Sequence, residues 1–378
     1  MNFDFSDDQK MLKDQARKFL QDKCSYDDVR KILEGDASHD DSLWQGLCEL
    51  GFAGAAIPEE FGGLGLGALE LCVIAEELGQ VAAPVPFSSS IYLAAEGLKL
   101  FASTEQKQAW LPKLASGEMI GTLAAAEGTH APSPKSITTR FADGKINGTK
   151  LPVADGGTAN FALVLANSGG AGEQALSLVL VTLDDDGITR REVETIDPTR
   201  GHVELIFENT PAALVGKAGE GWSNYKRIEA GAAVLMAFEQ IGGAEAAMNM
   251  AKEYALTRYA FGRQIGSYQA VKHRVADMYV KLELARSNCY YGAMMLAEEG
   301  ADLEIAAAAA RVAATEAYRF AAQENIQLHG GIGFTWEANT QFHYRRSKLL
   351  ALALGNASRW KDRLVTALEQ KNAQSNVA

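Results

Sequence analysis

Apolar residues recur at helical spacing in the first and the last third of the chain. Near the N-terminus they lie four or five positions apart, as in Met11, Ala16 and Leu20. A longer stripe at alternating spacings of four and three comprises Val271, Val275, Met278, Leu282 and Ala285. This period predicts helices that bury one face, and the second stripe is typical of a bundle helix.

The middle of the chain shows short β-prone runs separated by polar turns. Three such runs are 161–165, 176–183 and 202–207, and a DDDG turn at 184–187 follows the second of them. Runs of this length predict a small β-barrel or sandwich that contains no helix of normal length.

The expected fold is therefore α+β and mostly α. We place an N-terminal helical domain at residues 1–120, a β-domain at 121–219 and a C-terminal four-helix bundle at 220–378. A chain of 378 residues has room for three domains of ordinary size.

The charge balance is acidic, with 36 Lys and Arg against 48 Asp and Glu, so the formal net charge is 36 − 48 = −12. Nucleic acids and anionic membranes are bound through basic surfaces, so neither is an expected partner. The N-terminus lacks the apolar segment of a signal peptide, and the longest uncharged run, 78–95, contains two prolines. A cytoplasmic location without a membrane span is expected.

The four cysteines are far apart and form no CxxC pair, so neither a zinc site nor a disulfide framework is predicted. We expect buried free thiols. The spacing Gly63-x-Gly65-x-x-Ala68 resembles a dinucleotide loop, but no buried strand precedes it and no acidic residue follows about twenty positions later. A Rossmann domain is not expected.

Two C-terminal segments carry candidate chemistry. The first reads RYAFGRQI from Arg258 and is followed by Gln269, and the second reads QLHGGIGF from Gln327. An arginine fork can bind a pyrophosphate through planar, charge-assisted hydrogen bonds, and adjacent glycines let backbone amides approach a bulky ligand. Each segment also has an ordinary structural explanation, as a charged helix end or a helix cap.

Together with PEEFGG from Pro58 and the helix–β–helix order, these segments resemble the acyl-CoA dehydrogenases. The resemblance covers nearly the whole chain. It implies an FAD enzyme that forms a Cα=Cβ bond in an acyl-CoA thioester, with a Glu carboxylate as the base. It also implies that part of this chain binds the adenine and pyrophosphate half of an FAD whose flavin ring lies in a neighbouring subunit. The residues implied are Arg258, Phe261, Gln269, Gln327, Gly330 and Gly331.

Several positions depart from the family pattern. The two usual sites of the catalytic Glu align with Leu354 and with Ala232, and neither residue can take a proton. In the β-domain, the flavin-binding Thr-Glu-Pro motif appears as Ala126-Glu127-Gly128, and Trp-Ile-Thr appears as residues 152–154 with the sequence PVA. The chain thus keeps the residues that would bind the FAD of a neighbouring subunit, and it lacks a flavin pocket and a base of its own.

With these departures, the chain resembles the base-less subunit of the heteromeric α2β2 acyl-CoA dehydrogenases that act on steroid or bile-acid side chains. It implies a heterotetramer in which a homologous partner subunit carries the catalytic Glu, an acyl-CoA substrate, and an electron-transfer flavoprotein as acceptor. No catalytic residue and no metal ligand is assigned to this chain.

Two alternatives remain open. One is a self-sufficient homotetramer with a non-standard base, for which Glu229 and Glu239 are the nearest carboxylates; both are expected to be helix-surface charges. The other is a non-enzymatic scaffold that binds a CoA thioester. His329, inside the second segment, is expected to be a structural histidine.

Overall fold

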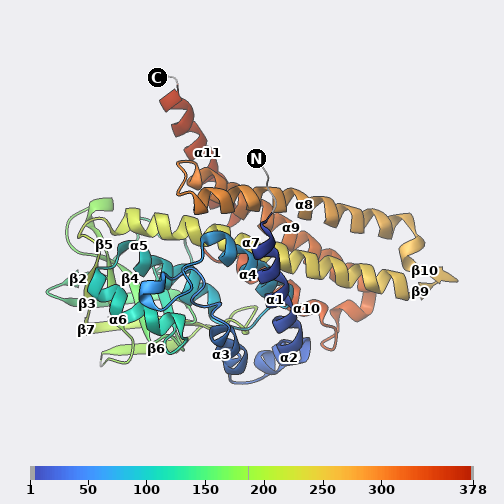
Figure 1. The fold of residues 1–378 in the computed structure, drawn as a ribbon, viewed down its shortest axis with the longest axis horizontal. Coiled ribbons are helices and arrows are strands. Elements are labelled where there is room, and N and C mark those ends of the chain that lie inside the picture. The colour runs from blue at the N-terminus through green and yellow to red at the C-terminus, as the bar shows by residue number, and fades with distance from the viewer. Residues whose placement is uncertain (1–4, 186, 376–378) are drawn as a thin grey trace. The chain divides into compact units, whose positions relative to one another are not determined.

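The computed structural model describes residues 5–185 and 187–375. Helices precede the β-region and follow it, which confirms the expected class (Figure 1). The N-terminal helices are α1 (Asp7–Lys23), α2 (Tyr26–Glu34), α3 (Asp41–Glu49), α4 (Ala68–Gln80), α5 (Glu96–Phe101) and α6 (Thr104–Ala115), with the π-helix η2 (Ser88–Ala95) before α5. The C-terminal helices are α7 (Gly221–Thr257), α8 (Gln269–Ala297), α9 (Leu303–His329), α10 (Thr340–Leu352) and α11 (Ala357–Ser375).

The middle segment forms one eight-stranded sheet in the order β6-β7-β3-β2-β4-β5-β8, with β1 paired to β4. The strands are β1 (Gly121–Ala124), β2 (Arg140–Ala142), β3 (Lys145–Ala154), β4 (Phe161–Asn167), β5 (Leu176–Thr182), β6 (Ile188–Glu192), β7 (His202–Pro211) and β8 (Ala213–Val215). All three predicted runs are strands. In the described part of this segment the one helical turn is η3 (Glu173–Ala175), as the sequence predicts.

The contacts divide the chain into two compact units. One comprises Met1–Arg30, Ala68–Ala83 and Ala233–Ala378, and the other comprises Lys31–Gly67 and Pro84–Ala232. Each unit has its own core. Strands β4 and β5 are buried along almost their whole length in the second unit, and the alanine-rich helix α9 is buried in the first.

Helices α4 and α7 cross at close range inside the first unit. A Cβ atom added to Gly79 would collide with the backbone oxygen of Glu239, and one added to Gly242 would collide with that of Glu76. The two backbones therefore meet because glycine stands at the crossing on both helices. Beside this crossing the fully buried Glu76 pairs with Arg286 of α8 and, at 2.7 Å, with Lys13 of α1.

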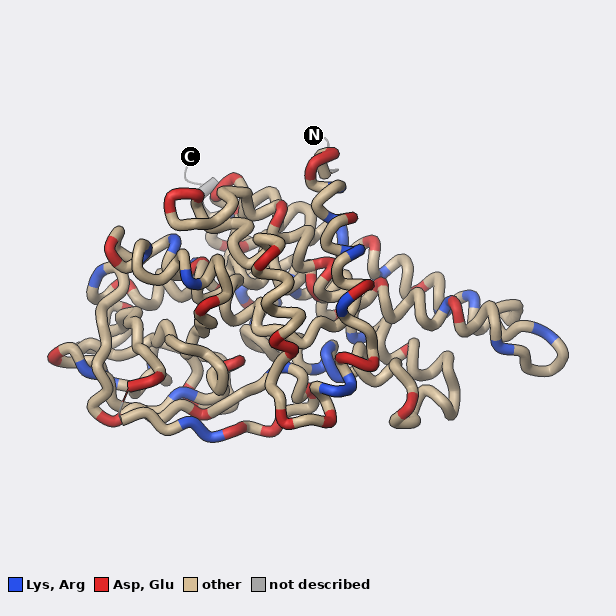
Figure 2. Tube along the Cα trace, turned by 60° about the horizontal axis from the view of Figure 1, so that its bottom comes forward, with Lys and Arg blue, Asp and Glu red and all other residues tan. Residues whose placement is uncertain are grey.

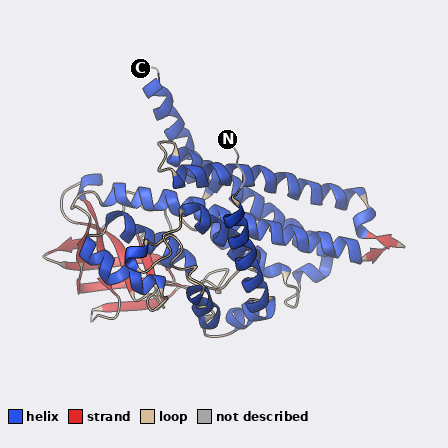
Figure 3. Ribbon diagram, in the orientation of Figure 1, coloured by secondary structure: helices blue, strands red, loops and turns tan. Residues whose placement is uncertain are grey.

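The predicted stripe on α8 is confirmed in its second half. Met278, Leu282 and Ala285 are buried, whereas Val271 and Val275 are only half-buried. All four cysteines are free and buried, as expected. Figure 3 shows the predominance of helix and the short hairpin between α7 and α8.

Candidate cofactor-binding end of the C-terminal helices

A tight hairpin connects α7 to α8. Strand β9 (Tyr259–Ala260) pairs antiparallel with β10 (Arg263–Gln264), so Phe261 and Gly262 form a two-residue loop. Their φ values are +50° and +78°. Positive φ at both loop residues is the mark of a type I′ turn, which matches the twist of the flanking strands.

The hairpin presents its apolar residue to solvent. Phe261 is 97% exposed in this chain. Around it, the Tyr268 hydroxyl donates to the Ala260 oxygen at 3.0 Å, and the Arg263 guanidinium lies 4.0 Å from the centre of the Tyr268 ring. The turn is thus held by these contacts, while the Phe261 ring has almost no contact with its own chain.

Arg258 follows α7 directly and is exposed. Its amide donates to the Tyr254 oxygen and its carbonyl accepts from the Ile265 amide, both at 2.8 Å. The backbone at Arg258 is therefore fixed at both sides. Residues 258–274 contain four Lys and Arg and no Asp or Glu, so this end of the helices is locally basic in an acidic protein (Figure 2). Gln269, the first residue of α8, is exposed there as well.

The glycines of the second segment, Gly330, Gly331 and Gly333, differ in whether the fold requires a glycine at that position. Gly330 has φ of +63°, a conformation that favours glycine. A Cβ on Gly333 would collide with the Ile326 oxygen, so the packing of the chain itself requires a glycine there. Gly331 has neither reason: its φ is not positive, and a Cβ would meet no atom within 4 Å. Gln327, one turn earlier on α9, is exposed like both Gly330 and Gly331.

An aromatic stack brings the two segments together. The rings of Tyr254 on α7 and His329 on α9 lie 4.2 Å apart at 24°. Arg258 is one helical turn beyond Tyr254, and Gly330 directly follows His329. Because the stack joins the ends of α7 and α9, the arginine and the open glycines lie at the same end of the helices. No pattern in the sequence signals this pairing, since Tyr254 belongs to no motif.

The β-domain position of the flavin motif is occupied by an ion pair. Lys150 of β3 is fully buried and donates to Glu127 at 2.7 Å and to the Ala125 oxygen at 3.2 Å, while Thr138 and Thr139 also donate to Glu127. Desolvation opposes ionisation of Glu127, but the Lys150 charge and the hydrogen bonds hold the pKa of Glu127 at about 2. Burial lowers the pKa of Lys150 to about 8. Glu127 therefore serves the fold of the β-domain.

The two base positions are apolar, as the sequence indicates. Ala232 and Ala233 are completely buried in α7. Leu354 has φ of +61°, and its carbonyl accepts hydrogen bonds from Arg359 at 2.8 Å and Trp360 at 3.0 Å. The turn at Leu354 is held firmly, yet its side chain cannot exchange a proton.

The expectation that Glu229 and Glu239 are helix-surface charges is wrong. Both side chains are buried, at 0% and 1% exposure. Glu229 accepts from the Tyr225 hydroxyl at 2.6 Å. Glu239 lies 3.5 Å from Arg346, which also donates to the Ala82 and Ala83 oxygens. Helix α7 is buried on every side from residue 228 to residue 244, so both of these carboxylates are interior, whereas Lys252 and Glu253 near its end are exposed.

Among residues 5–185 and 187–375, no helix is long and apolar enough to cross a membrane, and no group of three His, Cys, Asp or Glu side chains that could hold a metal ion occurs.

Comparisons with known proteins agree with the geometry. The chain is 35% identical over 320 residues to the acyl-CoA dehydrogenase IpdE2 of Mycobacterium tuberculosis, covering 84% of each chain. It superposes with a TM-score of 0.88 on a chain of the ChsE4-ChsE5 complex from Mycobacterium tuberculosis, at 27% identity over 98% of this chain and 99% of that one. A chain of the Tcur3481-Tcur3483 steroid acyl-CoA dehydrogenase variant gives 0.87, at 29% identity over 97% and 99%.

Two family models cover most of the sequence. The acyl-CoA dehydrogenase N-terminal domain matches residues 6–118, and the acyl-CoA dehydrogenase C-terminal domain matches residues 219–364. The chain belongs to the acyl-CoA dehydrogenase family of FAD-dependent oxidoreductases.

Proposed function

We propose that this chain is the base-less subunit of a heteromeric, FAD-dependent acyl-CoA dehydrogenase. A homologous partner subunit supplies the flavin pocket and the catalytic Glu, and this chain supplies the groups that bind the adenine and pyrophosphate half of the partner's FAD. The observation that carries the proposal is the division of the motifs: Arg258, Phe261 and Gly331 are exposed, whereas Leu354 and Ala232 replace the base.

The exposed residues fit a dinucleotide. Arg258 offers a charged fork to the pyrophosphate, Phe261 offers an apolar face to a ring, and the amides at Gly330 and Gly331 are open to approach. The Gln269 and Gln327 amides lie at the same end as further donors. When bound, FAD accepts the two electrons of Cα–Cβ oxidation as a hydride equivalent. This chain contributes binding and orientation of the cofactor.

The proposed substrate is an acyl-CoA thioester with a bulky steroid or bile-acid side chain, and an electron-transfer flavoprotein is the proposed acceptor. Two similar structures support this assignment, because each is a pair of different chains and one of them is described as a steroid enzyme. A cytoplasmic heterotetramer with domains at 1–120, 121–219 and 220–378 completes the proposal.

The test is co-expression with a homologous chain that carries Glu at one of the two base positions. The chain purified alone should be colourless, and the complex should be yellow with FAD. Arg258→Ala should weaken FAD retention by the complex at least tenfold, which corresponds to the loss of about 1.4 kcal/mol or more, as expected for a charge-assisted bond. Arg140→Ala, at another exposed arginine, is the matched control. Stoichiometric FAD in this chain alone would contradict the proposal, and a partner that is fully active without this chain would favour a scaffold.

A self-sufficient enzyme is the second candidate, and one observation favours it. Glu229 is a buried carboxylate that is hydrogen-bonded to Tyr225 one turn before the base position at Ala232. Buried carboxylates can act as general bases. In that case, reduction of flavin by an acyl-CoA should require no second subunit.

A further inference from the structure

We propose that the Tyr254–His329 stack is a positioning device that holds Arg258 and the Gly330–Gly331 amides in register for one ligand. The inference rests on the proposed trans FAD site. It assigns a role to two residues that belong to neither the arginine fork nor the open glycines.

The stack is connected to both groups through short stretches of backbone. Tyr254 accepts the Arg258 amide at its backbone oxygen, at 2.8 Å, and its ring stacks on His329, the residue before Gly330. Arg258 follows α7 while Gly330 follows α9, so each leaves its helix immediately beyond the stack. A shift of one helix end against the other would therefore separate the guanidinium from the amides.

The imidazole is fixed on its own helix. His329 Nδ1 lies 2.8 Å from the Asn325 carbonyl oxygen, which can only accept, so Nδ1 carries the proton. Burial lowers the pKa of His329 below its ordinary value, which favours the neutral ring. Gly333 backs the residue closely, because a Cβ there would lie 3.0 Å from the His329 Cβ. The ring orientation is thus set by the helix and by the neighbouring turn.

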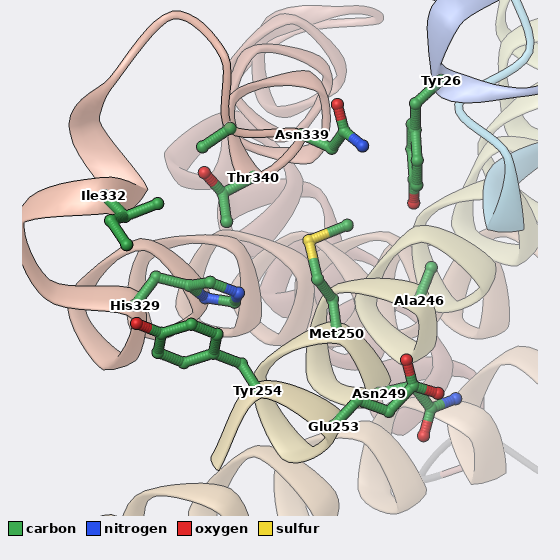
Figure 4. A pocket seen from close by; sticks show the side chains of 11 residues that line it. Tyr26, Ala246, Asn249, Met250, Glu253, Tyr254, His329, Ile332, Asn339 and Thr340 are labelled. Atoms are coloured by element: carbon green, nitrogen blue, oxygen red, sulfur yellow. The ribbon is translucent and has the colours of Figure 1, made fainter. Parts of the chain in front are cut away.

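On its other side the stack borders open space. A cavity of about 510 Å³ is lined by Tyr254 and His329 together with Met250, Glu253 and Ile332, and Figure 4 shows both rings at its edge. Side chains that border a cavity are less constrained by packing than those in a filled core. The stack links the two helix ends at this edge, and one turn further in the Asn325 amide donates to the Met250 sulfur at 3.3 Å.

The fold has other links between α7 and α9. Gln240 donates to Thr315 at 3.1 Å, and Arg311 donates to Gln240 at 2.5 Å, in the buried middle of both helices. Loss of the terminal stack should therefore loosen the helix ends and leave the bundle folded.

The experiment compares Tyr254→Leu, His329→Leu and Tyr254→Phe in the complex with its partner. FAD affinity is measured by titrating the cofactor-free complex, and amide exchange is followed across residues 328–333. Both Leu variants should bind FAD at least tenfold more weakly and exchange faster, while Tyr254→Phe, which keeps the ring, should match the unmodified chain. Tyr290→Leu removes a stack of 6.0 Å with Phe238 elsewhere and should lower the Tm without changing FAD affinity.

The outcomes distinguish a failure of the positioning role from a failure of the proposed trans FAD site. If Arg258→Ala loses FAD but Tyr254→Leu binds it normally, the positioning role is overturned and the trans site stands. If Tyr254→Phe is as weak as Tyr254→Leu, the ring stack is not the cause, and the inference also fails. If Arg258→Ala leaves FAD binding unchanged, the proposed function itself is overturned.

Discussion

At the scale of single residues, two glycines two positions apart, Gly331 and Gly333, allow ligand binding and folding to be tested separately. Gly331→Ala adds a methyl group into open space at an unstrained backbone, so the Tm should change by no more than about 2 °C. In the heteromer the same methyl group should reduce FAD affinity, because it blocks approach to the amide. Differential scanning fluorimetry and FAD titration would measure both effects.

The matched change is Gly333→Ala. Its Cβ would collide with the Ile326 oxygen, so the variant should lose about 1–3 kcal/mol of stability even without a ligand. Equal loss of stability in both variants would show that Gly331 is also a packing glycine.

The buried pair of Lys150 and Glu127 predicts a pH dependence of stability. The pKa of Glu127 lies at about 2 in the folded chain and near 4.5 in the unfolded chain. A carboxylate with a depressed folded pKa stabilises above its unfolded pKa, and this stability is lost as the pH falls from 4.5 toward 2. Glu127→Gln should therefore be less stable at pH 7 and lose less on acidification, as followed by thermal melts.

Glu208→Gln, at an exposed carboxylate, should keep the slope of the unmodified chain. If Glu127→Gln keeps that slope too, another group governs acid unfolding.

How far single residues could be predicted depended on whether a motif surrounded them. The six cofactor-binding candidates were found from two segments, and the structure leaves all six exposed. The burial of Glu229 and Glu239 could not be predicted because α7 is buried on every side from residue 228 to residue 244. On such a helix no polar face marks which charges lie inside, so periodicity carries no information about them.

At the scale of elements, the β9–β10 hairpin allows the stability of the turn and the binding of FAD to be tested separately. A type I′ turn prefers Asn before Gly, and Phe261 pays the cost of a left-handed conformation there. Phe261→Asn should therefore equal or exceed the unmodified chain in Tm. In the complex it should bind FAD at least several-fold more weakly because the apolar ring is lost. A fall in Tm would show that Phe261 stabilises its own chain.

At the crossing of α4 and α7, we expect that glycine cannot be replaced even by alanine. Gly242→Ala would force a methyl group into the backbone of Glu76, so we expect a loss of about 3 kcal/mol or more, or failure to fold. Lys252→Ala, on the exposed face of the same helix, should change stability by no more than about 0.5 kcal/mol. Urea unfolding would compare them, and a stable Gly242→Ala would mean that the helices can move apart.

Long, strongly patterned elements could be predicted, and short ones could not. The apolar runs at 161–165 and 176–183 became β4 and β5 because a buried strand needs that many β-prone residues. Strands β9 and β10 have two residues each, too few for any period. Their pairing depends on the turn and on contacts from Tyr268 that the sequence does not reveal.

At the scale of the whole molecule, the order of helices, sheet and helices followed from the hydrophobic pattern, whereas the identity of the active site did not. The pattern of buried and exposed positions indicates which side chains form the core of the chain itself. The exposed Phe261 and the open Gly331 have no such internal role, so this pattern assigns them none, and the role proposed for them comes from the family resemblance.

The last prediction decides between a half-site subunit and a complete enzyme. If the partner carries the base, Glu229→Gln and Glu239→Gln should leave kcat per assembled complex unchanged. Glu239→Gln should still lower the Tm, because it removes a buried carboxylate charge 3.5 Å from the buried Arg346. A drop in kcat by orders of magnitude in Glu229→Gln, with assembly and FAD content intact, would instead make Glu229 the base. Normalising the rate to bound FAD keeps the loss of stability from imitating a loss of chemistry.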